Sequence, residues 1–341
     1  MARALLGLSL LLLVACDPGP QTLEFGGETM GTTYTVIALD STGELEVETV
    51  QAAVEEALAR VNAIMSNWDP NSEISQFNSS ESTAPVAISA ELAEVMDAAN
   101  TVHDQSLGRF DVTLGPLIEL WGFGARTAES PVPADEAIAA ALDVVGQRDV
   151  LTLTDAPATL EKLHAGTTVY LAAIAKGYGV DVVGATLEEF GVDNYMVEIG
   201  GDLLTAGTNP DGAQWRIGIE RPDAANRTVE EVVEMSDLGM ATSGDYRNYF
   251  EEDGVRYSHI IDAETGRPIT HTTASVTVLA ESAMMADAWA TALLALGQER
   301  GLPIADQNNL AAFFIVRDPS SGETRFATTA SARFEELQAR N

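Results

Sequence analysis

The chain has 341 residues, of which 46% are hydrophobic and 28 are glycine, a composition typical of a globular protein with a substantial core. Its 18 lysine and arginine residues are outnumbered by 52 aspartate and glutamate residues, which gives a formal net charge of -34. This excess of negative charge makes nucleic acid and anionic lipid surfaces poor partners for the body of the protein. Only two lysines occur, Lys162 and Lys176, so an anionic substrate has few places at which to find positive charge.

The first sixteen residues, MARALLGLSLLLLVAC, have the layout of a secretory signal. One arginine precedes an apolar run that is too short to span a bilayer comfortably, and small Ala15 precedes Cys16. We therefore expect residues 1–15 to be cleaved as a signal peptide. The end of this stretch also resembles the bacterial lipoprotein box, in which the cysteine is lipidated and becomes the mature N-terminus. The alternative is an ordinary signal peptide that happens to end in cysteine.

Cys16 is the only cysteine of the chain, so the mature protein can form no internal disulfide and no cysteine zinc site. A single thiol at this place in an exported chain favours lipid anchoring over redox chemistry. Asp17 follows it directly. This indicates retention at the periplasmic face of the inner membrane, if the host is a Gram-negative bacterium that follows the enteric sorting rule.

A polar segment rich in glycine and proline predicts a tether over residues 16–27, and residues 28–340 are expected to form one large domain. Apolar periodicity and β-branched runs predict the elements of this domain. In chain order they are a strand at Thr29–Leu39, helices at Leu45–Met65, Ser89–Asp104 and Ala134–Val145, strands at Val150–Thr154 and Thr167–Leu171, a helix at Ala172–Gly191, strands at Asn194–Gly207, Trp215–Pro222, Val229–Met235 and Ser275–Ala280, a helix at Ser282–Leu296, a strand at Leu310–Val316 and a helix at Ala332–Gln338. Because several strands follow one another directly, we expect an α+β fold with a largely antiparallel sheet rather than a doubly wound parallel fold.

An ordered loop is predicted at Ser66–Asn78, SNWDPNSEISQFN, because this stretch is rich in turn residues. It contains Trp68 and Phe77. An aromatic residue in such a loop is either a plug of the hydrophobic core or a stacking surface for a planar ligand, and the sequence leaves both open.

The sequence contains no G-x-G-x-x-G, Walker A, H-E-x-x-H or G-x-S-x-G motif, which argues against the common nucleotide-binding, zinc-protease and serine-hydrolase classes. Lys176 precedes glycine near a predicted helix start, where backbone amides and a cationic side chain suit a phosphate. A surface lysine beside a helix-packing glycine is the alternative. The turn at Gly200-Gly201-Asp202 either lets a ligand approach the backbone closely or is an ordinary bulge.

The segment Gly239–Thr291 holds three features that an enzyme could use: a Ser/Gly turn in ATSGDY, His259 before a short apolar stretch, and two oxygen-bearing side chains on the predicted helix. Asp287 and Thr291 are four residues apart, so they lie on one helix face and could converge on one cation. A solvated aspartate and a threonine bonded to its own helix are the alternative. The four histidines of the chain are too scattered for a metal cluster, and His259 is either a general base or a satisfied core histidine.

Several stretches, in one order across nearly the whole mature chain, together resemble the FAD:protein FMN transferases, the ApbE family. They are MGTTY at Met30, SNWDPNSEISQFN at Ser66, GRFDVTLGPLIELWGFG at Gly108, AIAKGYGVD at Ala173, EIGGD at Glu198, WRIGIERP at Trp215, ATSGDY at Ala241, HIIDAETGRP at His259, and SVTV through ADAWATAL around Asp287. The resemblance implies an α+β, T-fold-like single domain in which largely antiparallel sheets pack with helices. It also implies an exported or lipid-anchored Mg²⁺ enzyme that cleaves FAD, attaches FMN through its phosphate to a threonine or serine of a target protein, and releases AMP.

The resemblance further implies roles for individual residues. It makes His259 the candidate catalytic base, and it maps metal ligands onto Asp287, Thr291 and the backbone carbonyl of Ala173. Mg²⁺ prefers oxygen ligands and binds through a few protein groups plus substrate phosphates, so this ligand set is chemically consistent. The contacts to the flavin nucleotide map onto Met30, Trp68, Arg109, Phe110, Asp111, Lys176 and Ile261.

One departure from the family pattern concerns Tyr170. The family commonly has an aspartate three residues before the carbonyl ligand, in a D-L-x-x-I-A-K-G pattern, whereas this chain reads YLAAIAKG from Tyr170. A carboxylate contact to the cofactor is therefore missing or replaced by the phenol of Tyr170. We expect this change to weaken FAD binding or to alter specificity.

Two other functions stay open on the same scaffold. One is a Mg²⁺-dependent FAD pyrophosphatase, in which water replaces the acceptor hydroxyl and FMN and AMP are released; the other is a flavin-binding lipoprotein without turnover. For a transferase, the resemblance implies an acceptor that is a flavin-bearing subunit of a membrane electron-transfer complex or an exported reductase. Ala173 and Lys176 lie far upstream of Asp287, so the predicted cation site requires these two segments to meet in the fold.

Overall fold

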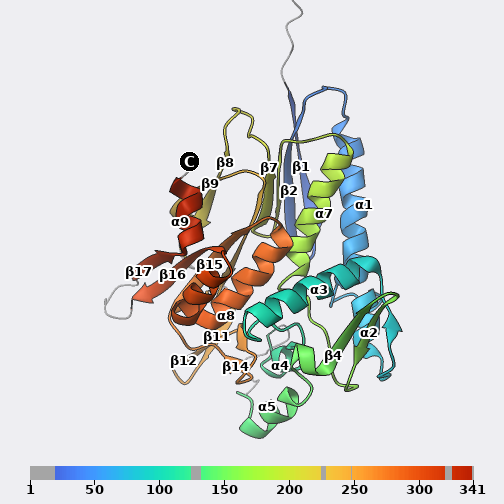
Figure 1. The fold of residues 1–341 in the computed structure, drawn as a ribbon, viewed down its shortest axis with the longest axis vertical. Coiled ribbons are helices and arrows are strands. Elements are labelled where there is room, and N and C mark those ends of the chain that lie inside the picture. The colour runs from blue at the N-terminus through green and yellow to red at the C-terminus, as the bar shows by residue number, and fades with distance from the viewer. Residues whose placement is uncertain (1–19, 124–131, 224–227, 247, 319–324, 340–341) are drawn as a thin grey trace, which may run out of the picture.

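An eight-stranded sheet runs through the computed structural model, which describes residues 20–123, 132–223, 228–246, 248–318 and 325–339 (Figure 1). Each pair of neighbouring strands is antiparallel. The strand order is β1 (Gln21–Thr29), β2 (Thr32–Asp40), β6 (Tyr195–Ile199), β7 (Asp202–Ala206), β10 (Leu238–Gly244), β15 (Thr273–Ala280), β16 (Ala311–Asp318) and β17 (Arg325–Ala330). This arrangement confirms the predicted α+β class with a largely antiparallel sheet.

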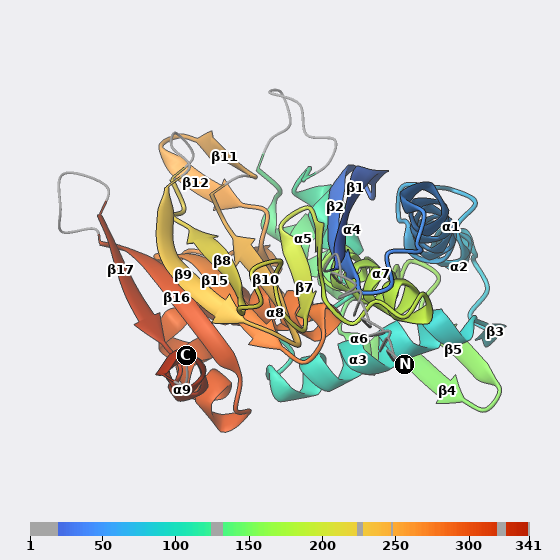
Figure 2. The same cartoon turned by 90° about the horizontal axis from the view of Figure 1, so that it is seen from above.

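Helices α7 (Ala175–Glu189) and α8 (Ala283–Gln307) lie side by side against this sheet, and α1 (Val47–Met65) packs on α7 (Figures 1 and 2). Helix α3 (Ala90–Gln105) packs against α8. The predicted helical spacing holds for α1, whose buried residues are Val50, Val54, Ala57, Leu58, Val61, Ile64 and Met65. Helix α8 is interrupted at Gly297, where φ is 71° and ψ is 166°, so the helix predicted to end at Leu296 is its first part.

The two faces of the sheet pack against different partners, because successive residues of a strand point to opposite faces. On β10, Ala241 packs into the cluster that contains α8, whereas Met240 packs into a cluster with the hairpin of β8 (Trp215–Glu220) and β9 (Val229–Met235). On β16, Phe314 and Phe313 divide in the same way, and Phe313 meets Phe334 of α9 (Ala332–Ala339) at 5.2 Å between ring centroids. Around β10 and β16 the sheet is therefore covered on both sides.

An aromatic cluster joins a second group of elements at one end of the sheet. Tyr257 lies 4.9 Å from Phe250 and 5.5 Å from Trp121, and Phe123 lies 5.7 Å from Phe250, as ring-centroid distances. These contacts pack a hairpin against the end of α4 and so support the segment that leads to His259. The elements of this group are α4 (Gly115–Leu120), α5 (Asp135–Leu142), β11 (Tyr249–Glu252), β12 (Val255–Ser258), β13 (Ile261–Asp262) and β14 (Arg267–Pro268).

The remaining elements form a small three-stranded sheet and two short helices beside α3. They are α2 (Glu73–Ser79), β3 (Val86–Ala87), α6 (Gln147–Val150), β4 (Leu151–Asp155) and β5 (Ala158–Lys162). Lys162 is fully buried here, and its ammonium donates to the backbone oxygens of Phe77, Asn78 and Thr167. One of the two lysines is therefore committed to structure and is not available to a substrate.

Four local predictions differ from the structure. Residues 21–27, predicted as part of a tether, belong to β1 and pair with β2 over their whole length. The predicted loop Ser66–Asn78 contains most of α2, the predicted turn in ATSGDY lies largely within β10, and Thr167–Leu171 is irregular rather than a strand.

Side chains replace a strand partner at Thr167–Leu171. Asn78 accepts from the backbone of Val169 (2.7 Å) and donates back to its carbonyl (2.8 Å). Asn67 donates to the same carbonyl (2.7 Å) and accepts from the backbone N–H of Leu171 (2.9 Å). These side-chain amides supply the hydrogen bonds that a neighbouring strand would otherwise supply to the backbone. A segment rich in β-branched residues can therefore remain outside the sheets.

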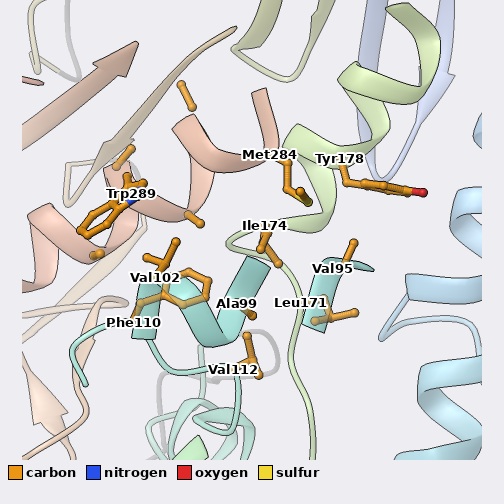
Figure 3. Close-up of a cluster of buried hydrophobic side chains, with 14 of the residues drawn as sticks. Val95, Ala99, Val102, Phe110, Val112, Leu171, Ile174, Tyr178, Met284 and Trp289 are labelled. Atoms are coloured by element: carbon orange, nitrogen blue, oxygen red, sulfur yellow. The ribbon is translucent and has the colours of Figure 1, made fainter. Parts of the chain in front are cut away.

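The hydrophobic core ties together the segments that carry the predicted site residues (Figure 3). Buried side chains of α3 contact a cluster drawn from three other segments of the chain. Its members Phe110, Ile174, Met284 and Trp289 each lie within three residues of a predicted site residue. The core therefore fixes the backbone from which the site residues project.

Within the described residues no helix is both long and apolar enough to cross a membrane. The predicted signal peptide and Cys16 fall in residues 1–19, outside the described ranges.

Gly177 offers a test of the contact between α7 and α8. A Cβ at this position would lie 2.3 Å from the backbone oxygen of Ala283 on α8, so Gly177→Ala should force the helices apart. We expect the free energy of unfolding to fall by about 1–3 kcal/mol, measured by urea unfolding.

Gly179→Ala is the matched control in the same helix. Its Cβ would meet the end of the flexible Met30 side chain, which can move aside, and both variants gain the same helix propensity. Gly179→Ala should therefore be clearly the more stable of the two, and equal stabilities would contradict the close helix contact.

Candidate active site

A cavity of about 540 Å³ opens where the loop before α7, the first turns of α7 and α8, and the ends of β10 and β13 meet. It is lined by most of the residues predicted to carry chemistry: Arg109, Phe110, Asp111, Tyr170, Ala173, Lys176, His259, Ile261, Asp287 and Thr291. The two segments that the predicted cation site requires to meet therefore do so in the structure.

The junction of α7 and α8 places the predicted metal ligands. Asp287 accepts a hydrogen bond from the backbone N–H of Gly177 at 3.2 Å, which joins the two helices directly. One turn further along α8, the Thr291 hydroxyl lies 2.9 Å from that of Ser243 on β10. Asp287 and Thr291 thus face the cavity from one side of α8, as their spacing predicts.

Lys176 forms an ion pair with Asp202, the residue that follows the Gly200-Gly201 turn. This turn is a two-residue hairpin loop in which both glycines have positive φ, 55° and 97°, a conformation that favours glycine. It holds the start of β7 against the start of α7. The Gly-Gly-Asp sequence is therefore a tight turn, and its aspartate is part of the site.

The cluster at this junction combines two buried carboxyl groups with one ammonium. Asp202 and Asp287 are both almost fully buried, and Lys176 is the cation between them. Burial and the neighbouring charge of Asp287 raise the pKa of Asp202 well above its usual range, although Lys176 opposes the shift. Burial likewise raises the pKa of Asp287, against the opposing effect of Lys176 and Gly177. Burial and the close approach of the two carboxyl groups favour their protonated forms, and a bound cation would favour the ionised forms instead.

The donor set around this cluster consists of oxygens. Within the described ranges, no three or more His, Cys, Asp or Glu side chains group in a way that could hold a metal. A cation here would therefore need hydroxyl and carbonyl ligands in addition to a carboxylate. The Asp287 carboxylate, the Thr291 hydroxyl and the Ala173 carbonyl supply that combination, which fits a hard ion such as Mg²⁺.

His259 is held at the end of β12 with its tautomer defined by its neighbour. Its Nδ1 lies 2.9 Å from the backbone oxygen of Asn248, which can only accept, so Nδ1 carries the proton and Nε2 is left as a base. The ring also meets Phe123 edge to face at 6.3 Å. Burial lowers the pKa of His259 from 6.5, although the contact to Asn248 and the charge of Asp245 oppose the shift. The imidazole is therefore neutral at pH 7.

Arg109 adds a buried positive charge to the cavity wall. Its guanidinium lies 3.6 Å from Asp262, the last residue of β13, and pairs with Glu264 in the loop between β13 and β14. The Nε atom of Arg109 is buried and has no hydrogen-bond partner among the described residues. One donor of this cavity-lining residue is therefore left without a partner within the described part of the chain.

Asp111 and Phe110 line the cavity but are also used by the fold. The Asp111 carboxylate accepts from the backbone N–H groups of Thr113 (2.7 Å) and Gln147 (2.9 Å), which fixes the loop to the start of α6. Phe110 is buried in the main core. Their predicted contacts to a flavin nucleotide stay predictions.

A second cavity, of about 770 Å³, adjoins the first and shares Ile118 and Tyr170 with it. Trp68 lies on its wall and is 74% exposed, so it is not a plug of the core. Met30, by contrast, lines neither cavity: it sits in the turn between β1 and β2 with its side chain beside Gly179 of α7.

Comparison with known proteins places this arrangement in a family. A family model described as the ApbE family matches residues 30–314. The FAD:protein FMN transferases of Vibrio cholerae and Haemophilus influenzae are 44% and 41% identical to this chain, over 91% and 96% of it and over 92% and 94% of their own lengths. The chain belongs to the ApbE family.

Solved structures of ApbE proteins have the same fold. The flavin transferase ApbE from Vibrio cholerae has a TM-score of 0.84 at 41% identity, covering 93% of this chain and 99% of its own. The apo form of the flavinyl transferase ApbE from Pseudomonas stutzeri has a TM-score of 0.84 at 39% identity, covering 94% and 97%. These comparisons confirm the predicted family and its mixed fold of antiparallel sheet and helices.

Sequence reasoning missed several residues that shape this ApbE site. The sequence places Asp202 only in a glycine turn and Ser243 only in ATSGDY, although Asp202 contacts Lys176 and Ser243 contacts Thr291. Asn67 and Asn78 hold the segment before Ala173 through the backbone of Val169. Asn67 and Asn78 lie near the two ends of the family-like segment SNWDPNSEISQFN, and this position is the sequence feature that could have indicated their role.

The state of His259 can be measured by NMR with ¹⁵N-labelled histidine. We expect Nδ1 to be protonated and Nε2 unprotonated at pH 7, and the ring to titrate below 6.5 because it is buried. The exposed His164 provides a reference signal in the same sample. A pKa at or above 6.5, or a proton on Nε2, would contradict the assignment of His259 as a base that is ready at neutral pH.

Proposed function

We propose that this ApbE protein transfers FMN from FAD to a threonine or serine hydroxyl of a target protein, with Mg²⁺, and releases AMP. The observation that carries the proposal is one cavity that joins a neutral histidine, a lysine and an oxygen ligand set. The names of its relatives give the donor and the group transferred.

The reaction requires one bond to form and one to break. The acceptor oxygen attacks the phosphorus of the FMN half of FAD, the bond from that phosphorus to the bridging oxygen breaks, and AMP leaves. His259 Nε2 accepts the proton of the attacking hydroxyl, because Nδ1 already donates to Asn248. The donor thus becomes an ester of the target protein and AMP.

Lys176 and Arg109 supply positive charge to the pyrophosphate. Both line the cavity, and both are paired with carboxylates that keep them in place. Asp287, Thr291 and the carbonyl of Ala173 would hold Mg²⁺, which when bound neutralises charge on the pyrophosphate oxygens. Positioning of donor and acceptor supplies much of the remaining rate.

The second cavity is the proposed place of the isoalloxazine ring. It adjoins the first through Ile118 and Tyr170, so a flavin nucleotide could extend from one to the other. Trp68 presents an exposed ring on its wall, and stacking of a planar ring on such a surface is favourable. This favours the ligand-stacking alternative for Trp68 over the core plug.

The proposed acceptor is a flavin-bearing subunit of a membrane electron-transfer complex or an exported reductase. Lipid attachment at Cys16 after removal of residues 1–15 would hold the enzyme at the periplasmic face of the inner membrane, and the N-terminal sequence supports this. Cys16→Ser should move the protein from the membrane fraction to the soluble fraction of lysed cells. Unchanged membrane association of that variant would contradict the lipid anchor.

One assay separates the three functions. The purified protein is incubated with FAD, Mg²⁺ and a candidate acceptor, and AMP and the flavin fluorescence of the denatured acceptor are measured. Covalent fluorescence with AMP supports the transferase, AMP with free FMN supports the pyrophosphatase, and absence of AMP leaves only binding.

Asp287→Ala should abolish the Mg²⁺-dependent reaction in this assay, because it removes the one carboxylate of the ligand set. Trp68→Ala is the matched control, since Trp68 is on the other cavity and touches no proposed ligand. We expect it to weaken FAD binding by about 1–3 kcal/mol while saturating FAD restores turnover. Full activity of Asp287→Ala would contradict the assignment of Asp287 as a metal ligand.

A further inference from the structure

The N-terminal end of α8 is capped from a neighbouring helix. Asp181 of α7 accepts from the backbone N–H of Ala283 through Oδ1 (2.7 Å) and from that of Met284 through Oδ2 (2.9 Å). The hydroxyl of Ser282 accepts the next N–H, that of Met285, at 3.2 Å. One carboxylate therefore satisfies two of the free donors of a helix to which it does not belong.

This bridge runs beside the contact that places Asp287. Asp181 lies four residues after Gly177 on α7, and Asp287 lies four residues after Ala283 on α8. At that spacing each pair shares one helix face, so Gly177 to Asp287 and Asp181 to Ala283 are adjacent links between the same two helices. They fix the rotation and the register of α8 against α7.

The link from Gly177 to Asp287 and the link from Asp181 to the start of α8 differ in their relation to the proposed metal site. The first uses one carboxylate oxygen of Asp287, a proposed metal ligand, so the same side chain would serve both the link and the metal. The second uses Asp181, which lines no part of the cavity and contacts none of the proposed ligands. The second link is therefore the one whose carboxylate takes no part in the proposed metal site.

The surroundings of Asp181 disfavour its charged form. Asp181 is half-buried, and the nearby charges of Glu94 on α3 and Asp287 on α8 are negative. No ion pair of Asp181 occurs within the described residues. Burial raises the pKa of Asp181 to about 6, although its two amide contacts oppose the shift. A carboxylate in such surroundings needs the hydrogen bonds that it makes, and here these are the helix bridge.

We propose that Asp181 is a positioning residue of the active site: by bridging α7 to the start of α8, it holds Asp287 and Thr291 where they can share a cation with the Ala173 carbonyl. This inference rests on the proposed function, because it assigns Asp181 a task only if the three oxygens bind a metal. It goes beyond the ligand set, which contains no residue of the bridge.

The test compares Asp181→Asn with Ser282→Ala. Asp181→Asn keeps the size of the side chain but removes its charge and turns one acceptor into a donor that faces an N–H. Ser282→Ala removes a cap bond from the same helix end without touching the bridge, at a cost of about 1 kcal/mol in stability. Mn²⁺ replaces Mg²⁺ as the probe, and its binding to the full-length protein with and without FAD is measured by the loss of the free-ion EPR signal, beside the melting temperature.

We expect Asp181→Asn to weaken Mn²⁺ binding by about 10- to 100-fold, the usual effect of removing a group that orients metal ligands. Ser282→Ala should lower the melting temperature but leave Mn²⁺ binding close to that of the unaltered protein. If Asp181→Asn does not fold, Asp181→Glu is compared in its place, because it keeps the charge while its extra methylene displaces the bridge.

Two outcomes overturn the inference alone. One is a Mn²⁺ affinity of the Asp181 variant equal to that of the unaltered protein; the other is an equal loss in the Ser282→Ala variant, which would make general fraying of the helix end the cause. If the unaltered protein binds no Mn²⁺ and forms no AMP from FAD, the proposed function fails and the inference fails with it. Transfer activity of the unaltered protein in the same preparation distinguishes these cases.

Discussion

The close contact between α7 and α8 is the constraint on which the rest of this structure depends. Glycine at position 177 lets the backbones approach, and the N–H of Gly177 and the carboxylate of Asp181 then bond across the gap. The contact brings the segment that carries Ala173 and Lys176 to the segment that carries Asp287. The sheet supports both helices, while α1 packs on α7 and α3 packs on α8. The site is thus built at a helix junction whose geometry is set by backbone groups.

The same junction gathers charged side chains in a protein that has a large excess of negative charge. A chain with a net charge of -34 places its one non-structural lysine between two buried aspartates, and commits the other, Lys162, to backbone carbonyls. An anionic pyrophosphate would be repelled by most of this surface. Half-buried Lys176 and buried Arg109, with a metal bound by Asp287, would reverse the local potential at the cavity. The electrostatics of the protein therefore favour binding at this one place.

Features that depend on local periodicity could be predicted from the sequence. Features that depend on hydrogen bonds from side chains distant in sequence could not. The apolar spacing of α1 and the four-residue interval from Asp287 to Thr291 both describe the structure, because helix geometry alone determines them. The predicted strand Thr167–Leu171 was wrong because amide side chains, distant in sequence, satisfy its backbone. The role of Asp202 beside Lys176 could not be read from the Gly-Gly-Asp turn, since that turn says nothing about which helix end faces it.

Tyr170 shows how a departure from a family pattern can be interpreted through the structure. It stands on the wall between the two cavities, where the pattern has an aspartate. Burial, with a smaller effect of Glu119, raises the pKa of Tyr170, so the phenol stays neutral and can donate a hydrogen bond. A carboxylate at this point would add negative charge to a cavity that must accept a pyrophosphate beside Asp202 and Asp287. The phenol avoids that added negative charge, and its proposed contact to the nucleotide and the expected effect on FAD binding or specificity stay predictions.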